Sequence, residues 1–316
     1  MKRREFLVAG GTLAMSAALP ARAAFPEKPV RYYIAFAPGG ESDIAARLQQ
    51  PYFRKKFGQE LVIDSKPGAG GALAWSQLNT FPGDGYTVMG TNLPHIVLQP
   101  LEGNVQYKTE DITNIHFFQY TPDAIIVRAE SPFKTYQDLV AAAKAKPGAL
   151  NFAGSGTNSA NHAAHERLNN LAGIKTTYVA FKGTGDLVAS LIGGHVDGAM
   201  SYSPLALSQK GKARMLAVAS EKRLELFPDV PTFKELGLDW VDGAIRGIGV
   251  PKSTPEDLRK KLSDMFSEIN RDPDFRKQML ENGFELMDIT YDKMPAFMEE
   301  RKKIYLSTAK LMGLAK

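Results

Sequence analysis

The chain of 316 residues contains no cysteine, which excludes disulfide bonds, cysteine-ligated metal sites and a cysteine nucleophile. It also lacks the spacing of a phosphate-binding P-loop, a nucleophile elbow and a dinucleotide-binding glycine fingerprint. Long hydrophobic runs are missing too, since the apolar stretch from Leu7 to Leu19 is too short to span a bilayer. These absences argue against the common nucleotide-dependent, hydrolytic and membrane-spanning classes.

An excess of charge of one sign is also absent. The formal net charge is +5, but the first 23 residues contain four basic residues and one acidic residue. The rest of the chain therefore carries a net charge of about +2, whereas a nucleic-acid-binding protein shows a strong basic excess. We expect no nucleic-acid partner.

The N-terminal residues have the pattern of an export signal. Lys2, Arg3 and Arg4 form a basic segment, an apolar segment follows, and Ala21-Arg22-Ala23 has the small-x-small pattern of a cleavage site. Residues 1–23 are therefore interpreted as a signal peptide that is cleaved after Ala23, and the mature protein is expected in the periplasm. Arg3-Arg4-Glu5-Phe6-Leu7 resembles a twin-arginine signal, and an ordinary secretion signal is the alternative.

The stretch from Val30 to Arg47 organises the mature chain. Its first part, through Ala37, is apolar and typical of a buried strand, and Pro38-Gly39-Gly40 forces a turn. Ser42 and Asp43 then begin a helix. Such an arrangement directs unpaired backbone N–H groups at one point and favours binding of an anion. A plain strand-to-helix connection is the alternative.

A second stretch repeats this pattern. The expected strand 150–153 leads into Gly154-Ser155-Gly156-Thr157-Asn158-Ser159, and a helix is expected over 160–171. Two such units suggest two α/β lobes that face each other across a cleft. We expect residues 24–122 and 241–316 to form one lobe and residues 123–240 the other, each with a mixed, mostly parallel sheet covered by helices on both faces.

The remaining pattern alternates between strands and helices. Pro51 should kink or split the first helix, because proline interrupts the backbone hydrogen bonds. Further strands are expected at 61–64, 86–89, 123–128, 177–181, 196–201, 215–219 and 244–250. Further helices are expected at 72–78, from 135, and at 186–192, 255–271 and 292–312, of which the last two are the long helices that finish the chain.

Catalytic chemistry has weak candidates. Ser155 is a possible nucleophile only if His162 lies beside it as a base. The side chains of His162, His165 and Glu166 can share a helix face, which leaves a metal site open. The simpler interpretation is a helix start with His162 near the mouth of the cleft and His165 on the surface. We therefore expect no catalytic residue, no metal and no cofactor.

Several motifs in fixed order resemble the substrate-binding proteins of tripartite tricarboxylate transporters, the Bug family. The resemblance covers the whole mature chain, and its motifs are Phe36 to Asp43 with Ala46-Arg47, Asp64 to Gly71, Asp84 to Thr87, Asn151 to His162, Phe181-Lys182-Gly183, Leu191 to Asp197, Pro228 to Thr232 and Val250-Pro251.

This resemblance implies a type II periplasmic-binding-protein fold, with two lobes joined by crossover strands. It also implies that a small carboxylate is captured between two loops. The residues expected to bind the ligand are Phe36, Ala37, Pro38, Gly39, Gly40, Ser42, Asp43, Gly154, Ser155, Gly156, Thr157, Asn158, His162, Lys182, Ser201, Tyr202 and Arg246.

The chain departs from the family pattern at two places. Many relatives carry an acidic residue where this chain has Met200-Ser201-Tyr202, and an aromatic residue where it has Ile245-Arg246-Gly247. Ser201 cannot pair with an amino group, which makes an amino-acid ligand less expected. Arg246 offers a planar cationic fork that suits a second carboxylate. The alternative is that Arg246 pairs with Asp242 or Asp239 and has no ligand role.

The sequence thus predicts an exported, monomeric receptor that binds an organic carboxylate, expected to be a dicarboxylate, and delivers it to membrane transporter subunits. Two alternatives stay open: an exported hydrolase or lyase that uses Ser155 or His162, and a ligand sensor for a membrane kinase. The ligand itself is not named by any motif.

The signal-peptide interpretation predicts that the mature protein begins at Ala24, because Ala21 and Ala23 form the cleavage pattern. N-terminal sequencing of protein from the periplasm tests this, and a retained Met1 would contradict it. Replacement of Arg3 and Arg4 by lysine should block export under the twin-arginine interpretation, whereas unchanged export would leave the general secretion route.

Overall fold

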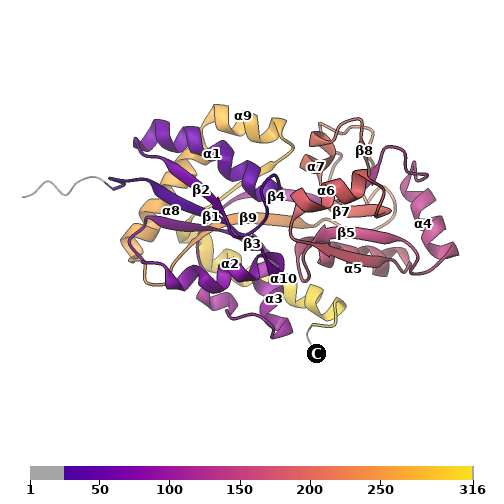
Figure 1. Ribbon diagram of the computed structural model, residues 1–316, viewed down its shortest axis with the longest axis horizontal. Coiled ribbons are helices and arrows are strands. Elements are labelled where there is room, and N and C mark those ends of the chain that lie inside the picture. The colour runs from indigo at the N-terminus through magenta and orange to yellow at the C-terminus, as the bar shows by residue number, and fades with distance from the viewer. Residues whose placement is uncertain (1–24, 315–316) are drawn as a thin grey trace, which may run out of the picture.

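The computed structural model describes residues 25–314 of the chain, and the predicted signal peptide lies outside these residues (Figure 1). The described residues form strands and helices in alternation along most of the chain. The strands are β1 (Val30–Ile34), β2 (Leu61–Ser65), β3 (Thr87–Leu93), β4 (Thr113–Arg128), β5 (Asn151–Ser155), β6 (Thr177–Phe181), β7 (Gly198–Tyr202), β8 (Ala213–Val218), β9 (Gly243–Val250) and β10 (Glu285–Ile289).

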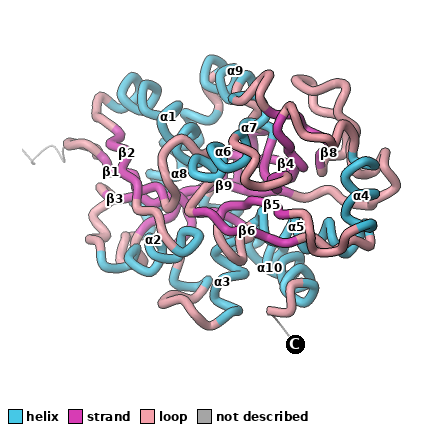
Figure 2. Tube along the Cα trace, turned by 45° about the vertical axis from the view of Figure 1, so that its right-hand side comes forward, coloured by secondary structure: helices cyan, strands magenta, loops and turns pink. Residues whose placement is uncertain are grey.

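The helices lie on both sides of the strands. Helices α1 and α9 lie on one side, and α2, α3 and α10 lie on the other (Figure 2). Their bounds, with those of the other helices, are α1 (Glu41–Phe57), α2 (Ala72–Gln77), α3 (His95–Glu102), α4 (Tyr136–Ala145), α5 (Ala160–Ala172), α6 (Thr184–Ile192), α7 (Ser203–Ser208), α8 (Glu256–Asn270), α9 (Pro273–Glu281) and α10 (Met294–Leu311). In the part of the chain that is described, no helix is long and apolar enough to cross a membrane.

One strand, β4, belongs to both halves of the sheet. The strand order is β2-β1-β3-β9-β4-β7-β5-β6, and β10 and β8 also pair with β4. Pairing is parallel between β1 and its neighbours β2 and β3, and between β5 and its neighbours β6 and β7. Every ladder of β4 is antiparallel. The parallel units expected from the sequence therefore flank an antiparallel centre.

The chain crosses between the two halves within β4. Pro122 pairs with Gly243 of β9, and the next residue, Asp123, pairs with Tyr202 of β7. The return crossing precedes β9. We therefore propose the division expected from the sequence, and we call residues 25–122 and 241–314 the first lobe and residues 123–240 the second lobe.

Helix α1 corrects one prediction. The sequence predicted a kink or a break at Pro51. The break is wrong, because α1 continues through Pro51 to Phe57, and the kink stays a prediction. Pro51 is exposed, so the carbonyl group that loses its hydrogen bond can turn toward water. Gly58 ends the helix in the left-handed conformation, and its N–H donates to the carbonyl of Arg54.

The C-terminal residues cover the first lobe, but they form more elements than the two helices expected from the sequence. Helix α9 and strand β10 lie between the two long helices α8 and α10, and the sequence analysis missed both. Helices α8 and α9 contact α1, and α10 contacts α3 and also α5 of the second lobe. Arg167 of α5, in the second lobe, contacts two residues of the first lobe. Its Nη1 donates to Oδ2 of Asp242 at 2.6 Å, and its Nη2 donates to Oγ1 of Thr308 at 3.0 Å. These contacts join the lobes beside the crossovers.

Each lobe has its own hydrophobic core. The core of the first lobe surrounds Phe53, Trp75 and Phe266. In the second lobe, one cluster includes Phe152 and Trp240, and another packs α6 and α7 against the opposite face of the sheet. Separate cores allow each lobe to keep its shape if the angle between them changes.

A polar network at Asp288 fastens β10 and α8 to β4. The carboxylate of Asp288 lies 2.8 Å from Nε2 of His116, 2.9 Å from Oγ of Ser267 and 2.8 Å from Nη2 of Arg271. Burial by itself raises the pKa of Asp288, but the hydrogen bonds from His116, Ser267 and Arg271 outweigh it and hold the pKa well below its usual range.

Replacing Asp288 by asparagine should lower the free energy of unfolding by about 1–3 kcal/mol at neutral pH, because several donors lose a charged acceptor. Since the carboxyl pKa is lower in the folded state, this contribution is present above the unfolded-state pKa of about 4 and is lost as the pH falls through the folded-state pKa. Denaturant unfolding at a series of pH values should therefore show the variant converging on the wild type in acid.

Asp292 provides the control, since its ion pair with Lys260 is exposed and Asp292→Asn should change stability little. Equal losses for the two variants at neutral pH would contradict the role given to Asp288.

Candidate functional site

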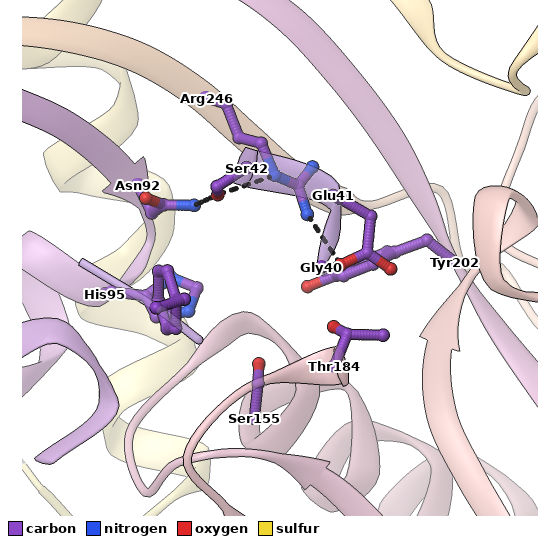
Figure 3. A pocket seen from close by; sticks show the side chains of 10 residues that line it. Gly40, Glu41, Ser42, Asn92, His95, Ser155, Thr184, Tyr202 and Arg246 are labelled. Atoms are coloured by element: carbon purple, nitrogen blue, oxygen red, sulfur yellow. Dashed lines mark hydrogen bonds and ion pairs between the residues drawn. The ribbon is translucent and has the colours of Figure 1, made fainter. Parts of the chain in front are cut away.

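A small polar cavity lies between the two lobes, near the crossovers. Figure 3 shows its labelled side chains converging on a common space. The cavity is lined by Phe36, Gly40, Glu41, Ser42, Asn92, His95 and Arg246 from the first lobe and by Ser155, Thr184 and Tyr202 from the second.

The cavity is narrow in this conformation. About 10 Å³ is available to the centre of a water molecule, which is room for about one water. A molecule the size of a dicarboxylate therefore fits only if the lobes move apart.

The N-terminus of α1 opens into the cavity. Gly40 is the N-cap residue and supplies no side-chain hydrogen bond, so the first N–H groups of the helix are left for another acceptor. Asp43 shapes the preceding turn, since its carboxylate accepts from the N–H of Gly39 and from Arg47, each at 3.0 Å. The turn predicted from Pro38-Gly39-Gly40 thus presents a helix start, a favourable place for an anion.

The N-terminus of α6 faces it from the second lobe. Gly183 is the N-cap residue and also lacks a side-chain cap, and Thr184 lines the cavity. A Cβ atom placed on Gly40 would lie 3.7 Å from the backbone nitrogen of Gly185, which shows how near the two helix starts are. Two uncapped helix N-termini therefore meet at the cavity.

The loop from Gly154 to Asn158 is arranged differently from the expectation. The N–H of Ser155 donates to Asn161, and the N–H of Asn158 donates to Nδ1 of His162 at 3.1 Å. Ser159 caps α5 by accepting from the N–H of His162. The N–H groups of Ser155 and Asn158 thus already have partners in the first turn of α5. Ser155 is the residue of this loop that lines the cavity.

The lobes touch through glycine residues. A Cβ atom on Gly185 would lie 2.4 Å from the carbonyl oxygen of Pro38, and one on Gly156 would lie 2.5 Å from Cα of Gly70. Neither distance is possible for a real side chain, so both positions need glycine in this conformation. The glycine-rich turns of one lobe thus pack backbone to backbone against those of the other.

Arg246 is held at the cavity wall by several groups. Its Nη1 donates to Thr121 at 2.6 Å and its Nε to Oγ of Ser42 at 3.3 Å, and its guanidinium lies 5.0 Å from the ring centre of Tyr202. Asn92 is the cross-strand neighbour of Arg246 and also donates to Ser42, at 3.3 Å. The alternative pairing of Arg246 with Asp242 or Asp239 is wrong, and Asp242 pairs with Arg167 instead.

Glu41 brings an acidic group into the same space. Its side chain is buried, and Oε2 lies 3.8 Å from Nη2 of Arg246. That distance is an ion pair but too long for a hydrogen bond. The charges of Glu41 and Arg246 therefore largely cancel at the cavity wall.

Two further groups at the cavity stay uncharged near neutral pH. Burial, and next the charge of Arg246, lowers the pKa of His95 to about 3. Burial, with a smaller effect of Asp123, raises the pKa of Tyr202 well above its usual value. Neutral imidazole and phenol groups can each donate one hydrogen bond to a ligand.

The structure brings some of the expected site residues together and leaves others apart. Those at the cavity are Phe36, Gly40, Ser42, Ser155, Tyr202 and Arg246. Lys182 is exposed, and Ser201 is buried in the ladder between β7 and β4. The other expected residues shape the adjoining loops or lie behind them, and these are Ala37, Pro38, Gly39, Asp43, Gly154, Gly156, Thr157, Asn158 and His162.

Four residues at the cavity were not predicted from the sequence, namely Glu41, Asn92, His95 and Thr184. Glu41 and Thr184 stand within or beside motifs that were recognised. Asn92 and His95 were not predicted because the strand was expected to end at residue 89, whereas β3 runs to Leu93. A longer strand would have placed both residues at the edge of the sheet where the cleft was expected.

The catalytic alternatives find no support in the geometry. Oγ of Ser155 is bonded to Asn161, and His162 stacks on Tyr178 with Nδ1 accepting from a backbone N–H. The surface position expected for His165 is wrong, because His165 is buried and bonded to Thr176 and Glu166. Among the described residues, no three His, Asp or Glu side chains are placed to hold a metal ion.

Comparison with known proteins gives a consistent result. A family model described as the tripartite tricarboxylate transporter family receptor matches residues 45–310. A UPF0065 protein of Cupriavidus necator is 31% identical over 100% of this chain and 99% of its own length.

Solved structures agree with the sequence comparisons. The periplasmic binding protein BugD has a TM-score of 0.86 at 27% identity, with 92% of this chain and 100% of that chain covered. MatC from Rhodopseudomonas palustris, solved with bound malate, has a TM-score of 0.83 at 27% identity, with 90% and 100% covered. The chain therefore belongs to the family of tripartite tricarboxylate transporter receptors, which are periplasmic solute-binding proteins.

Proposed function

We propose that the protein captures a small organic carboxylate, and preferably a dicarboxylate, between its lobes and delivers it to the membrane subunits of a tripartite tricarboxylate-type transporter. The observation that carries the proposal is the convergence of anion-binding groups on one cavity. Two uncapped helix N-termini meet there, and Ser42, Asn92 and Arg246 add side-chain donors. The family to which the chain belongs supports delivery to a transporter.

One carboxylate is proposed to lie between the helix starts of α1 and α6, near Thr184 and Ser155. The second is proposed to lie against Arg246 and Asn92. Oγ of Ser42 accepts from both Arg246 and Asn92, so its own proton is left to donate to the ligand.

The expected affinity follows from these contacts. Each charge-assisted hydrogen bond contributes roughly 1.5–3 kcal/mol, and each helix end about 0.3–1 kcal/mol. Loss of motional freedom offsets much of this. We expect 1:1 binding with a dissociation constant near or below micromolar.

Entry of the ligand requires the lobes to separate. The cavity has room for about one water in the closed arrangement, and the lobes are joined by two crossovers. The ligand gains its full set of contacts only when both lobes reach it, so binding favours closure.

Replacement of Gly185 by alanine should weaken binding of succinate by about 1–3 kcal/mol, the usual range for overpacking. The added Cβ atom would collide with the carbonyl oxygen of Pro38 and hold the lobes apart. Calorimetry measures the affinity, and small-angle scattering should show a smaller decrease in radius of gyration on ligand addition than for the wild type.

The control is Ser190→Ala in the same helix, far from the contact with Pro38. It should leave both affinity and compaction unchanged. Absence of any compaction in wild-type protein saturated with carboxylate would contradict capture between closing lobes.

Arg246→Ala should cost roughly 2–5 kcal/mol of succinate affinity, as expected when one partner of a buried charged contact is removed. Arg246→Lys should recover only part of this loss, because lysine cannot make a bidentate contact. Butyrate, which lacks the second carboxylate, should be nearly unaffected by either substitution. Calorimetry with the two acids gives the comparison.

Melting curves of the same variants separate ligand binding from stability. If Arg246→Ala binds succinate normally but melts lower, or loses succinate and butyrate equally, Arg246 belongs to the scaffold and not to the ligand site.

A further inference from the structure

The carboxylate of Glu41 has no hydrogen-bond partner within the described residues. Its Oε1 atom is buried and unpaired, and its Oε2 atom has only the distant ion pair with Arg246 at 3.8 Å. The side chain as a whole is 5% exposed. Figure 3 shows the carboxylate at the cavity, beside Arg246 and Tyr202.

A buried acceptor without a partner is costly, since it has lost its water and gained nothing in exchange. A purely structural glutamate at this position in α1 would be expected to hold a neighbouring N–H group or salt-bridge partner closely. Glu41 has no N–H donor, and its ion pair with Arg246 is long at 3.8 Å, although its place in the first turn of the helix favours a negative charge. Its free oxygen is therefore available to a group that enters the cavity.

The charge of Glu41 restricts what that group can be. A ligand carboxylate bound to Arg246 would also lie near Glu41, and two unshielded carboxylates repel each other. A hydrogen-bond donor on the ligand, placed between them, removes this conflict and satisfies Oε1. Because Nη2 of Arg246 lies 3.8 Å from Oε2 of Glu41, a donor on the carbon next to a carboxylate bound to Arg246 is the one expected to reach Glu41.

A hydroxyl group fits this position better than an ammonium group. An ammonium group has three protons to place. Two buried atoms of the cavity lining have no partner in the part of the chain that the structure describes, Oε1 of Glu41 and Nδ1 of His95, and the carboxylate oxygen is the stronger acceptor of the two. Ser42 already accepts from two donors, and the guanidinium of Arg246 would repel a second cation. A hydroxyl group needs one acceptor and can itself accept from a neutral donor such as Tyr202.

We propose that Glu41 makes the receptor selective for 2-hydroxy carboxylates, in which the carboxylate binds Arg246 and the adjacent hydroxyl donates to Glu41. This inference rests on the proposed function and specifies its ligand class. Glu41 is then a specificity-determining residue that contacts the ligand.

The test compares succinate with its 2-hydroxy and 2-amino derivatives, malate and aspartate, by calorimetry on the mature protein. The wild type should bind malate about 10- to 100-fold more tightly than succinate, which corresponds to one hydrogen bond to a charged group. Glu41→Leu should remove this preference and bind succinate more tightly, because Arg246 is no longer neutralised. Glu41→Gln should keep part of the preference, because its amide oxygen still accepts from a hydroxyl.

Glu60→Gln is the matched control, since Glu60 is an exposed carboxylate of the same lobe. It should leave the ratio of malate to succinate affinity unchanged. The conservative Glu41→Gln variant keeps the test decisive if Glu41→Leu folds poorly.

Any of four results would overturn the inference. Equal wild-type affinities for malate and succinate, or a preference that survives unchanged in both Glu41 variants, would remove Glu41 from ligand selection. Tighter binding of aspartate than of malate, abolished in both variants, would assign Glu41 to an ammonium group. Wild-type protein that binds no carboxylate would refute the proposed function itself, whereas carboxylate binding without hydroxyl preference would refute only this inference.

Discussion

The direct backbone contact between glycine turns of opposite lobes is the constraint on which the closed arrangement depends. Gly185 meets the carbonyl of Pro38, and Gly156 meets Gly70, at distances that leave no space for a Cβ atom. A side chain at either position would hold the lobes apart and widen the cavity between them. The glycines thus have two effects. They leave the N–H groups of the helix starts available to an anion, and they let the N-termini of α1 and α6 approach the same point.

Once the lobes are this close, the electrostatics of the cavity are set by very few groups. Arg246 and Glu41 lie within ion-pair distance and are both buried, while burial keeps His95 neutral by lowering its pKa. A buried ion pair gives little stability by itself, because the loss of hydration offsets the attraction. Such a pair can instead discriminate between ligands, since a ligand must satisfy a cation and an anion at once.

The fold and site were predictable from the sequence to different degrees. The strand, turn and helix start around Pro38 to Ser42 depend on adjacent residues, so local patterns were sufficient. Arg246 was recognisable as a lone charge in an apolar strand. Asn92 was not, because it reaches the cavity through the cross-strand register of β3 and β9. Thr184 requires knowledge of how the lobes meet, which no local pattern contains.

The position of β4 explains how the site can be partly formed before a ligand is enclosed. Arg246, Asn92 and Ser42 all belong to the first lobe, and Thr121, which holds Arg246, lies just before β4 changes partner. Because they share one lobe, we expect these groups to stay together in the proposed open form. Tyr202 pairs with β4 at Asp123, directly beside the crossover, so on opening we expect it to move less than Ser155 or Thr184. In the proposed mechanism, a carboxylate therefore meets Arg246 in the open form, and closure adds the contacts of the second lobe.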